Sequence, residues 1–214
     1  MSGHPGNRTL FKNLLLVLSM CLAAPPSPAG DPPRRVLFIC TGNYFRSAFA
    51  EHYFNFLSAR NQKLGAGDPL RKKVPWLAES RGMDLSQLSS SQRAARMSRY
   101  TVERLRKLGV PVPEEPRSRL PLHTPTLLSL QDLERFDRVI AMHDPSHRPM
   151  LRRFIAHHQA QGQVKDPRTL EDRVTYWNIE DVTLAPVIPL TPRQQADRSL
   201  DQLQKEVEAL FGAL

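Results

Sequence analysis

Residues 36–51 constrain the fold of this chain more than any other stretch, because an apolar run, a short loop and a helical pattern follow one another directly. The run V-L-F-I at 36–39 has the length and composition of a buried parallel strand. Residues 47–57 carry apolar side chains at helical spacing. The loop between them, residues 40–46, therefore leaves the carboxyl end of a strand and enters the amino end of a helix.

A loop in this position, here named the Cys40 loop, is predicted to bind an anion. Its free backbone N–H groups and the positive end of the helix dipole point into one small concavity. Gly42 and Asn43 are the residues best able to adopt the positive φ angles that such a nest requires. Cys40 is the first residue of the loop and Arg46 the last, so a thiol and a guanidinium are expected to face the same oxyanion from opposite sides.

These residue types indicate nucleophilic chemistry on a phosphate. A helix amino terminus and a neighbouring cation favour the thiolate, which is the reactive form of Cys40. Arg46 offers paired planar donors that match two phosphate oxygens. The hydroxyl of Ser47 is placed to donate to the sulfur and to help it leave later. The alternative is that Cys40 is a small buried apolar residue, but the C-x5-R-S spacing favours the nucleophile.

The block C-T-G-N-Y-F-R-S, preceded by V-L-F-I and followed by A-F-A-E, resembles the phosphate-binding loop (P-loop) of low-molecular-weight protein tyrosine phosphatases and the related arsenate reductases. The resemblance extends over about 34–214 and implies a three-layer αβα domain with a four-stranded parallel sheet, of the flavodoxin-like type. It implies that Thr41, Gly42, Asn43, Tyr44, Phe45 and Ser47 line or support the substrate site. Many relatives carry a second cysteine in the loop where Phe45 stands here, so a protective disulfide within the loop is excluded.

The rest of the chain alternates strands with helices, which independently predicts a parallel sheet covered on both faces. A ligand is then expected at the carboxyl ends of the strands. Residues 61–73 and 85–97 are predicted as loops, and the prolines between 111 and 125 exclude regular structure there. The further predicted strands are 74–80, 138–142 and 174–179. The further predicted helices are 98–109, 126–133 and 145–158, and Asp144 is expected to cap the last of these. A terminal helix is predicted to begin at Thr191 and Pro192.

A thiolate that attacks phosphorus needs a carboxyl group to protonate the leaving oxygen and then to activate water. The residues alone leave several candidates open: Asp144, Asp166, Asp172, Glu180 and Asp181. The resemblance favours Asp181, because the family's general acid lies late in the chain, after the last strand, in an Asp-Pro-Tyr motif. Val182 and Thr183 replace the proline and tyrosine here, so Asp166 remains the second choice and a purely structural role for Asp181 the third.

The other polar side chains near the loop are less informative. Tyr44 and Phe45 are placed to wall an aryl group or simply to pack. His143 and His147 have a spacing compatible with a metal, but without further clustered ligands a solvent-facing or phosphate-proximal place is favoured. We expect no metal and no cofactor, because Arg46 and the backbone compensate the phosphate charge.

The first thirty residues differ from the rest. Residues 14–24 form an apolar run of signal-peptide length behind Arg8 and Lys12, and a proline-rich linker follows. We therefore divide the chain into residues 1–31 and a phosphatase-like domain over 32–214. The segment is a secretory signal cleaved after Ala29, an uncleaved anchor, or an extension from a misassigned start. A free catalytic thiol favours the cytoplasm, with secretion or membrane contact through 1–24 as the alternative.

The 214 residues carry 30 Lys and Arg against 21 Asp and Glu, a formal charge of +9. The arginines form no stripe with aromatic residues, so no nucleic acid is expected and attraction of phosphorylated substrates is favoured. The sequence thus predicts a phosphate monoester hydrolase of the protein tyrosine phosphatase type, acting on a phosphorylated protein or small aryl phosphate through a phosphocysteine. The alternatives are an arsenate reductase that uses an external thiol, and a phosphate-binding module with little turnover.

Overall fold

The computed structural model describes residues 32–112, 122–182 and 190–214, and all statements below concern these residues. The signal-like segment, most of the proline-rich stretch after residue 112 and Thr183 lie outside them. Within the described residues no helix is both long and apolar enough to cross a membrane.

The predicted parallel sheet is confirmed. Its strands are β1 (Arg34–Cys40), β2 (Trp76–Gly82), β3 (Arg138–Ala141) and β4 (Val174–Tyr176), all parallel in the order β2-β1-β3-β4. Strand β1 lies inside the sheet, which explains its unbroken apolar sequence: both of its faces are covered.

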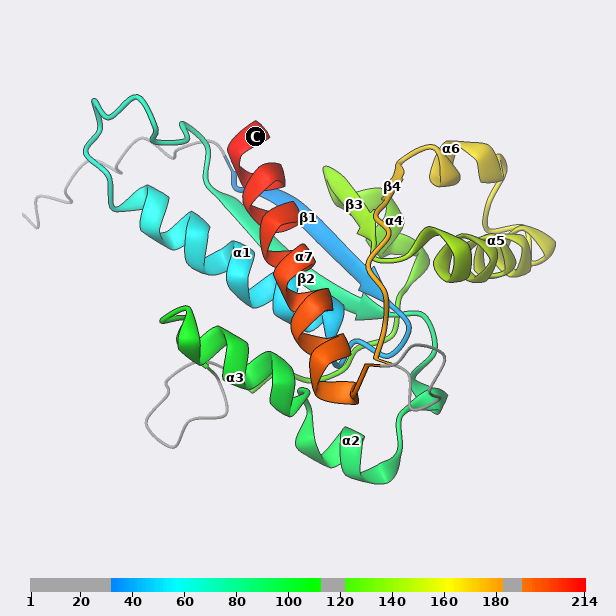
Figure 1. Ribbon diagram of the computed structural model, residues 1–214. Helices are drawn as coiled ribbons and strands as arrows, with labels where there is room; N and C mark the ends of the chain where they lie inside the picture. The colour runs from blue at the N-terminus through cyan, green and yellow to red at the C-terminus, as the bar shows by residue number, and fades with distance from the viewer. Residues whose placement is uncertain (1–31, 113–121, 183–189) are drawn as a thin grey trace, which may run out of the picture. The chain divides into compact units, whose positions relative to one another are not determined.

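Helices cover the two faces of this sheet (Figure 1). Val36 and Phe38 belong to one core, shared with α1 (Arg46–Gln62), α3 (Arg99–Lys107) and α7 (Pro192–Ala213). Leu37 and Ile39 belong to the other, shared with α4 (Leu130–Arg135), α5 (Asp144–Ala160) and α6 (Pro167–Glu171). The period of two along β1 therefore distributes its side chains between two cores, and the layered αβα class is confirmed.

Several local predictions were wrong. Residues 85–97, predicted as loop, contain a 3-10 turn (Leu85–Gln87) and α2 (Ser90–Ala95), whose capping box joins Ser89 and Gln92. Helix α4 starts at Leu130 and not at residue 126, because Leu127 forms an isolated β-bridge with Gly82. Strand β4 ends at Tyr176, three residues early.

The caps of two helices also differ from what the sequence predicts. Asp144 does not cap α5: His143 occupies that position, and the Asp144 carboxylate pairs with Arg148 one turn further on. Asp166 accepts a hydrogen bond from the Arg168 N–H and so caps the short helix α6, which was not predicted.

Candidate active site

The Cys40 loop joins the end of β1 to the start of α1, as the strand–loop–helix pattern predicts. Asn43 adopts the left-handed conformation with φ 52°, and its backbone N–H donates to Cys40 Sγ over 3.2 Å. The same expectation was wrong for Gly42, whose φ is not in that region. A Cβ at Gly42 would lie 2.8 Å from Leu88 Cδ2, so a larger residue there would require the Leu88 side chain to shift.

The Asn43 side chain fixes the direction of the hydrogen bonds behind the loop. Its Oδ1 accepts from the backbone N–H of Thr126, so its Nδ2 donates, to Ser47 Oγ over 3.1 Å and to Ser80 Oγ over 2.6 Å. Because Ser47 Oγ accepts there, its own proton is free for Cys40 Sγ, 2.9 Å away. The sulfur thus accepts two hydrogen bonds, one from the Asn43 N–H and one from the Ser47 hydroxyl.

Arg46 is held in place by the chain that follows β4. Its side chain is only 3% exposed, its Nη1 donates to the backbone oxygen of Ile179 over 2.9 Å, and its Nη2 pairs with Asp181. Its Nε is buried and has no hydrogen-bond partner among the described residues. A buried guanidinium with a free donor is ready for a further anionic oxygen.

Asp181 and Asp166, the two leading candidates for the general acid, lie in different places. Asp181 lines the same cavity as Cys40 and Arg46, and its side chain is 46% exposed. Asp166 bonds to its own helix through Arg168 and Thr169, and it does not line that cavity. Asp144 does not line it either.

The cavity over the Cys40 loop has a volume of about 970 Å³. Of the residues predicted to bind substrate, Thr41, Gly42, Tyr44 and Phe45 line it. Asn43 and Ser47 are fully buried and do not, so they support the loop from behind. Helices α2 and α3 complete the wall with polar, aromatic, basic and acidic side chains, namely Ser91, Gln92, Arg99, Tyr100, Glu103 and Arg106.

His147 lies behind the Cys40 loop. Its side chain is fully buried, so of the two predicted places the solvent-facing one was wrong, while its contacts with Thr41 and Arg46 put it beside the loop. Its Nδ1 accepts from the backbone N–H of His143 over 3.1 Å, which leaves the proton on Nε2, 3.3 Å from Thr41 Oγ1. Burial, followed by the Arg46 guanidinium, lowers the pKa of His147 to about 3. A neutral imidazole therefore lies against both Thr41 and Arg46.

Ser80, Glu51 and His123 form a further support that sequence reasoning missed. Ser80 Oγ accepts from Asn43 and donates to Glu51, while His123 Nε2 lies 2.9 Å from the backbone oxygen of Asn43. Because a carbonyl only accepts, His123 Nε2 carries the proton. No pattern in the sequence places His123 beside the Cys40 loop.

Comparison with known proteins reveals the fold. No protein-family model matches the sequence, and no curated protein matches it. Among solved structures, the low-molecular-weight protein tyrosine phosphatase from T. tengcongensis is 22% identical, with a TM-score of 0.55 over 85% of this chain and 99% of that one.

Two other solved structures are similar at lower identity. Vibrio vulnificus Wzb in complex with benzylphosphonate is 13% identical, with a TM-score of 0.53 over 85% of this chain and 99% of that one. The YwlE arginine phosphatase from Geobacillus stearothermophilus is 18% identical, with a TM-score of 0.50 over 84% and 91%. These similarities show that the chain has the fold of the low-molecular-weight phosphatases.

Proposed function

We propose that this protein hydrolyses phosphate monoesters, with an aryl phosphate such as phosphotyrosine as the preferred class, through a phosphocysteine intermediate on Cys40. The observation that carries the proposal is the meeting of a doubly hydrogen-bonded Cys40 sulfur and a buried Arg46 with an unpartnered Nε in one cavity. A thiol and a guanidinium held this way suit a tetrahedral oxyanion.

The first step is an in-line displacement. The Cys40 thiolate attacks phosphorus, the S–P bond forms and the ester O–P bond breaks. Arg46 and the loop N–H groups hold the equatorial oxygens, where charge is spread in the transition state. Asp181 gives its proton to the leaving oxygen.

The second step returns the enzyme to its starting state. Asp181, now a carboxylate, takes a proton from water, and the oxygen of that water attacks phosphorus as the S–P bond breaks. The departing sulfur regains its negative charge, and the Ser47 hydroxyl donates to it. Inorganic phosphate leaves.

The Arg46–Asp181 ion pair has a defined place in this cycle. Without substrate it holds the Asp181 side chain against Arg46. A phosphate dianion bound to Arg46 competes with Asp181 for the guanidinium. Substrate binding thus frees the Asp181 side chain to turn toward the leaving oxygen.

The aryl preference rests on the cavity wall. Tyr44 lines the cavity from the Cys40 loop itself, and Tyr100 lines it from α3 with the Arg99 guanidinium 4.9 Å from its ring. Two tyrosine rings provide stacking surface for an aryl group. One similar structure is described as an arginine phosphatase, so phosphoarginine is the second substrate to assay.

The test is steady-state hydrolysis of an aryl phosphate, free phosphotyrosine and phosphoarginine in the presence of a chelator. We expect turnover that Cys40→Ser abolishes and that Asp181→Asn lowers by about 10²–10⁴-fold. Activity retained by Cys40→Ser would overturn the covalent mechanism. Unchanged activity in Asp181→Asn, with wild-type activity low, would favour a phosphate-binding module with little turnover.

A further inference from the structure

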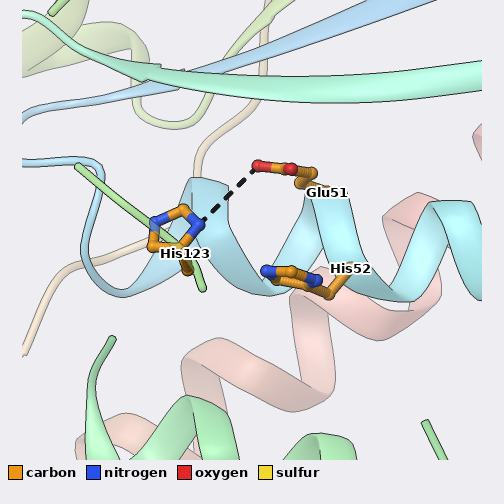
Figure 2. Close-up of side chains that lie close together, drawn as sticks. All are labelled: Glu51, His52 and His123. Carbon is orange, nitrogen blue, oxygen red and sulfur yellow. Dashed lines mark ion pairs between the residues drawn. The ribbon is translucent and has the colours of Figure 1, made fainter. Parts of the chain in front are cut away.

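A second cavity, of about 520 Å³, lies against the same loop and includes Asn43 but not Cys40 in its wall. Three side chains that can ligate metals meet in it: Glu51 and His52 from α1, and His123 from the segment before β3 (Figure 2). One ligand atom from each lies within 4.8 Å of the others. Nothing in the proposed phosphatase mechanism requires this grouping.

The hydrogen bonds around His123 leave two acceptor atoms facing each other. His123 Nε2 gives its proton to the Asn43 carbonyl, so in the neutral ring Nδ1 carries a lone pair. That lone pair lies 4.0 Å from Glu51 Oε2, joined by the dashed line in Figure 2. This separation is too long for a hydrogen bond and suits a cation between the two atoms.

His52 supplies a third possible metal ligand, a ring nitrogen without a hydrogen-bond partner among the described residues. Its Nε2 is buried and forms no hydrogen bond with any described residue, which is costly for a polar atom. Its ring lies 5.5 Å from the ring of His123, in an edge-on arrangement. Burial lowers the pKa of both histidines, that of His52 to about 4, so each ring is neutral and able to ligate.

We propose that Glu51, His52 and His123 bind a divalent transition metal of the Zn²⁺ class, with water from the cavity as a further ligand. Two imidazole nitrogens and one carboxylate oxygen are ligands that Zn²⁺ takes at about 2.0–2.2 Å, whereas Mg²⁺ and Ca²⁺ prefer oxygen alone. Tetrahedral geometry at these lengths sets ligand atoms roughly 3.4 Å apart. His123 Nδ1 and Glu51 Oε2, now 4.0 Å apart, would therefore approach by about half an ångström when the metal binds, which is a small side-chain movement.

The surroundings of the three ligands resemble those of metal sites in general. A ligating histidine usually donates its other ring proton to a carbonyl or carboxylate, and His123 does so to Asn43. Glu51 likewise accepts from Ser80, which accepts from Asn43. A bound metal would thus fix both supports of Asn43, the residue whose left-handed backbone shapes the Cys40 loop.

The experiment uses the full chain with Cys21→Ser and Cys40→Ser, which removes both thiols as competing zinc ligands. Zn²⁺ is titrated against a chromogenic chelator. We expect one Zn²⁺ per chain, no binding of Mg²⁺, and at least a tenfold loss of Zn²⁺ affinity in His52→Gln. His157→Gln is the matched control, because His157 is exposed on α5 and should leave the affinity unchanged. Equal affinity in His52→Gln and its parent would overturn the site.

Two further measurements distinguish loss of the metal site from a folding defect, and neither depends on the proposed phosphatase activity. Circular dichroism without metal must show the same thermal midpoint for His52→Gln and its parent. If the midpoints differ, the visible spectrum of Co²⁺ bound to the unmutated parent decides between the outcomes: the intense bands of a four-coordinate site support the proposal, and a weak six-coordinate spectrum overturns it. Neither readout needs catalysis, so failure of the phosphatase proposal would leave the metal site standing.

Discussion

At the scale of single residues, the site separates those that face the cavity from those that hold them. Cys40 and Arg46 face it, while Asn43, Ser47 and His147 are completely buried behind. The loop therefore has its shape before any ligand binds, because each of its supports is already hydrogen-bonded. Preorganised donors are the main source of electrostatic catalysis, so changes behind the loop should affect the rate.

Removal of the Ser47 hydroxyl should slow the second step most. Ser47→Ala takes away a donor to the departing sulfur, and we expect kcat to fall by about 10²-fold. Formation of the phosphocysteine should slow less than its hydrolysis. The intermediate therefore accumulates, and a burst of aryl alcohol becomes visible in stopped-flow traces. Ser58→Ala is the control, since Ser58 is also buried in α1 but bonds to the Trp76 carbonyl. An unchanged kcat in Ser47→Ala would contradict the assigned role.

His147 should make stability depend on pH. Its pKa is about 3 in the folded protein and about 6.5 when unfolded, so below pH 6.5 only the unfolded chain takes up the proton and stability is lost as the pH falls. This linkage amounts to about 2 kcal/mol between pH 7 and pH 5. His147→Gln removes it.

Urea unfolding at pH 5, 6 and 7 measures the effect. Between pH 7 and pH 5, His147→Gln should lose about 2 kcal/mol less unfolding free energy than the wild type does. Glu51, whose pKa burial raises to about 7, contributes equally to both proteins and cancels. The exposed His157→Gln should keep the wild-type slope. Parallel slopes in wild type and His147→Gln would refute a neutral buried His147.

At the scale of elements, the end of β2 at Gly82 allows the backbone of the Cys40 loop to approach closely. Cys40 pairs in register with Gly82. A Cβ on Gly82 would lie 2.9 Å from the backbone oxygen of Thr41 and 3.0 Å from the backbone nitrogen of Asn43. Backbone atoms cannot rotate away as a side chain does, so the loop itself would have to move.

Gly82→Ala should therefore impair catalysis as well as stability. We expect kcat/KM to fall by about 10²-fold, because a displacement of about 1 Å misplaces the nucleophile, and the unfolding free energy to drop by about 1–3 kcal/mol. Gly67→Ala is the control, since nothing lies within 4 Å of a Cβ there. Wild-type kinetics in Gly82→Ala would show that the strand end does not position the loop.

Elements were predictable from the sequence to the extent that apolar patterns define them. The four strands and the long helices α1, α5 and α7 carry such patterns. Helices α2, α4 and α6 span only five or six residues and are set by the local caps Ser89, Ser129 and Asp166. Short capped helices have little periodicity, so α2 and α6 were not predicted and the start of α4 was predicted four residues too early.

The site was predictable in the same uneven way. Cys40 to Ser47 were found because they are contiguous and their spacing carries the chemistry. Glu51, Ser80, His123 and His147 come from four separate parts of the chain and meet only after the sheet has formed. No local sequence pattern predicts contacts between residues so far apart in the chain.

At the scale of the whole molecule, the formal charge of +9 should act on the rate of encounter with anionic substrates. For an acidic phosphopeptide, kcat/KM should fall by about three- to tenfold as the ionic strength rises from about 0.01 M to about 0.15 M, since screening shortens the range of the field. A small aryl phosphate carries less charge and should respond less. Equal salt dependence for the two substrates would exclude steering by the protein's charge.

The most direct test of the central claim is to trap the covalent intermediate. The protein is mixed with an aryl phosphate, stopped with a denaturing quench during turnover and analysed by peptide mass spectrometry. We predict one phosphoryl group on the peptide that contains Cys40, formed at the rate of aryl alcohol release and absent in Cys40→Ser. Aryl phosphate turnover with no phosphorylated Cys40 at any time, or with equal turnover in Cys40→Ser, would contradict the account.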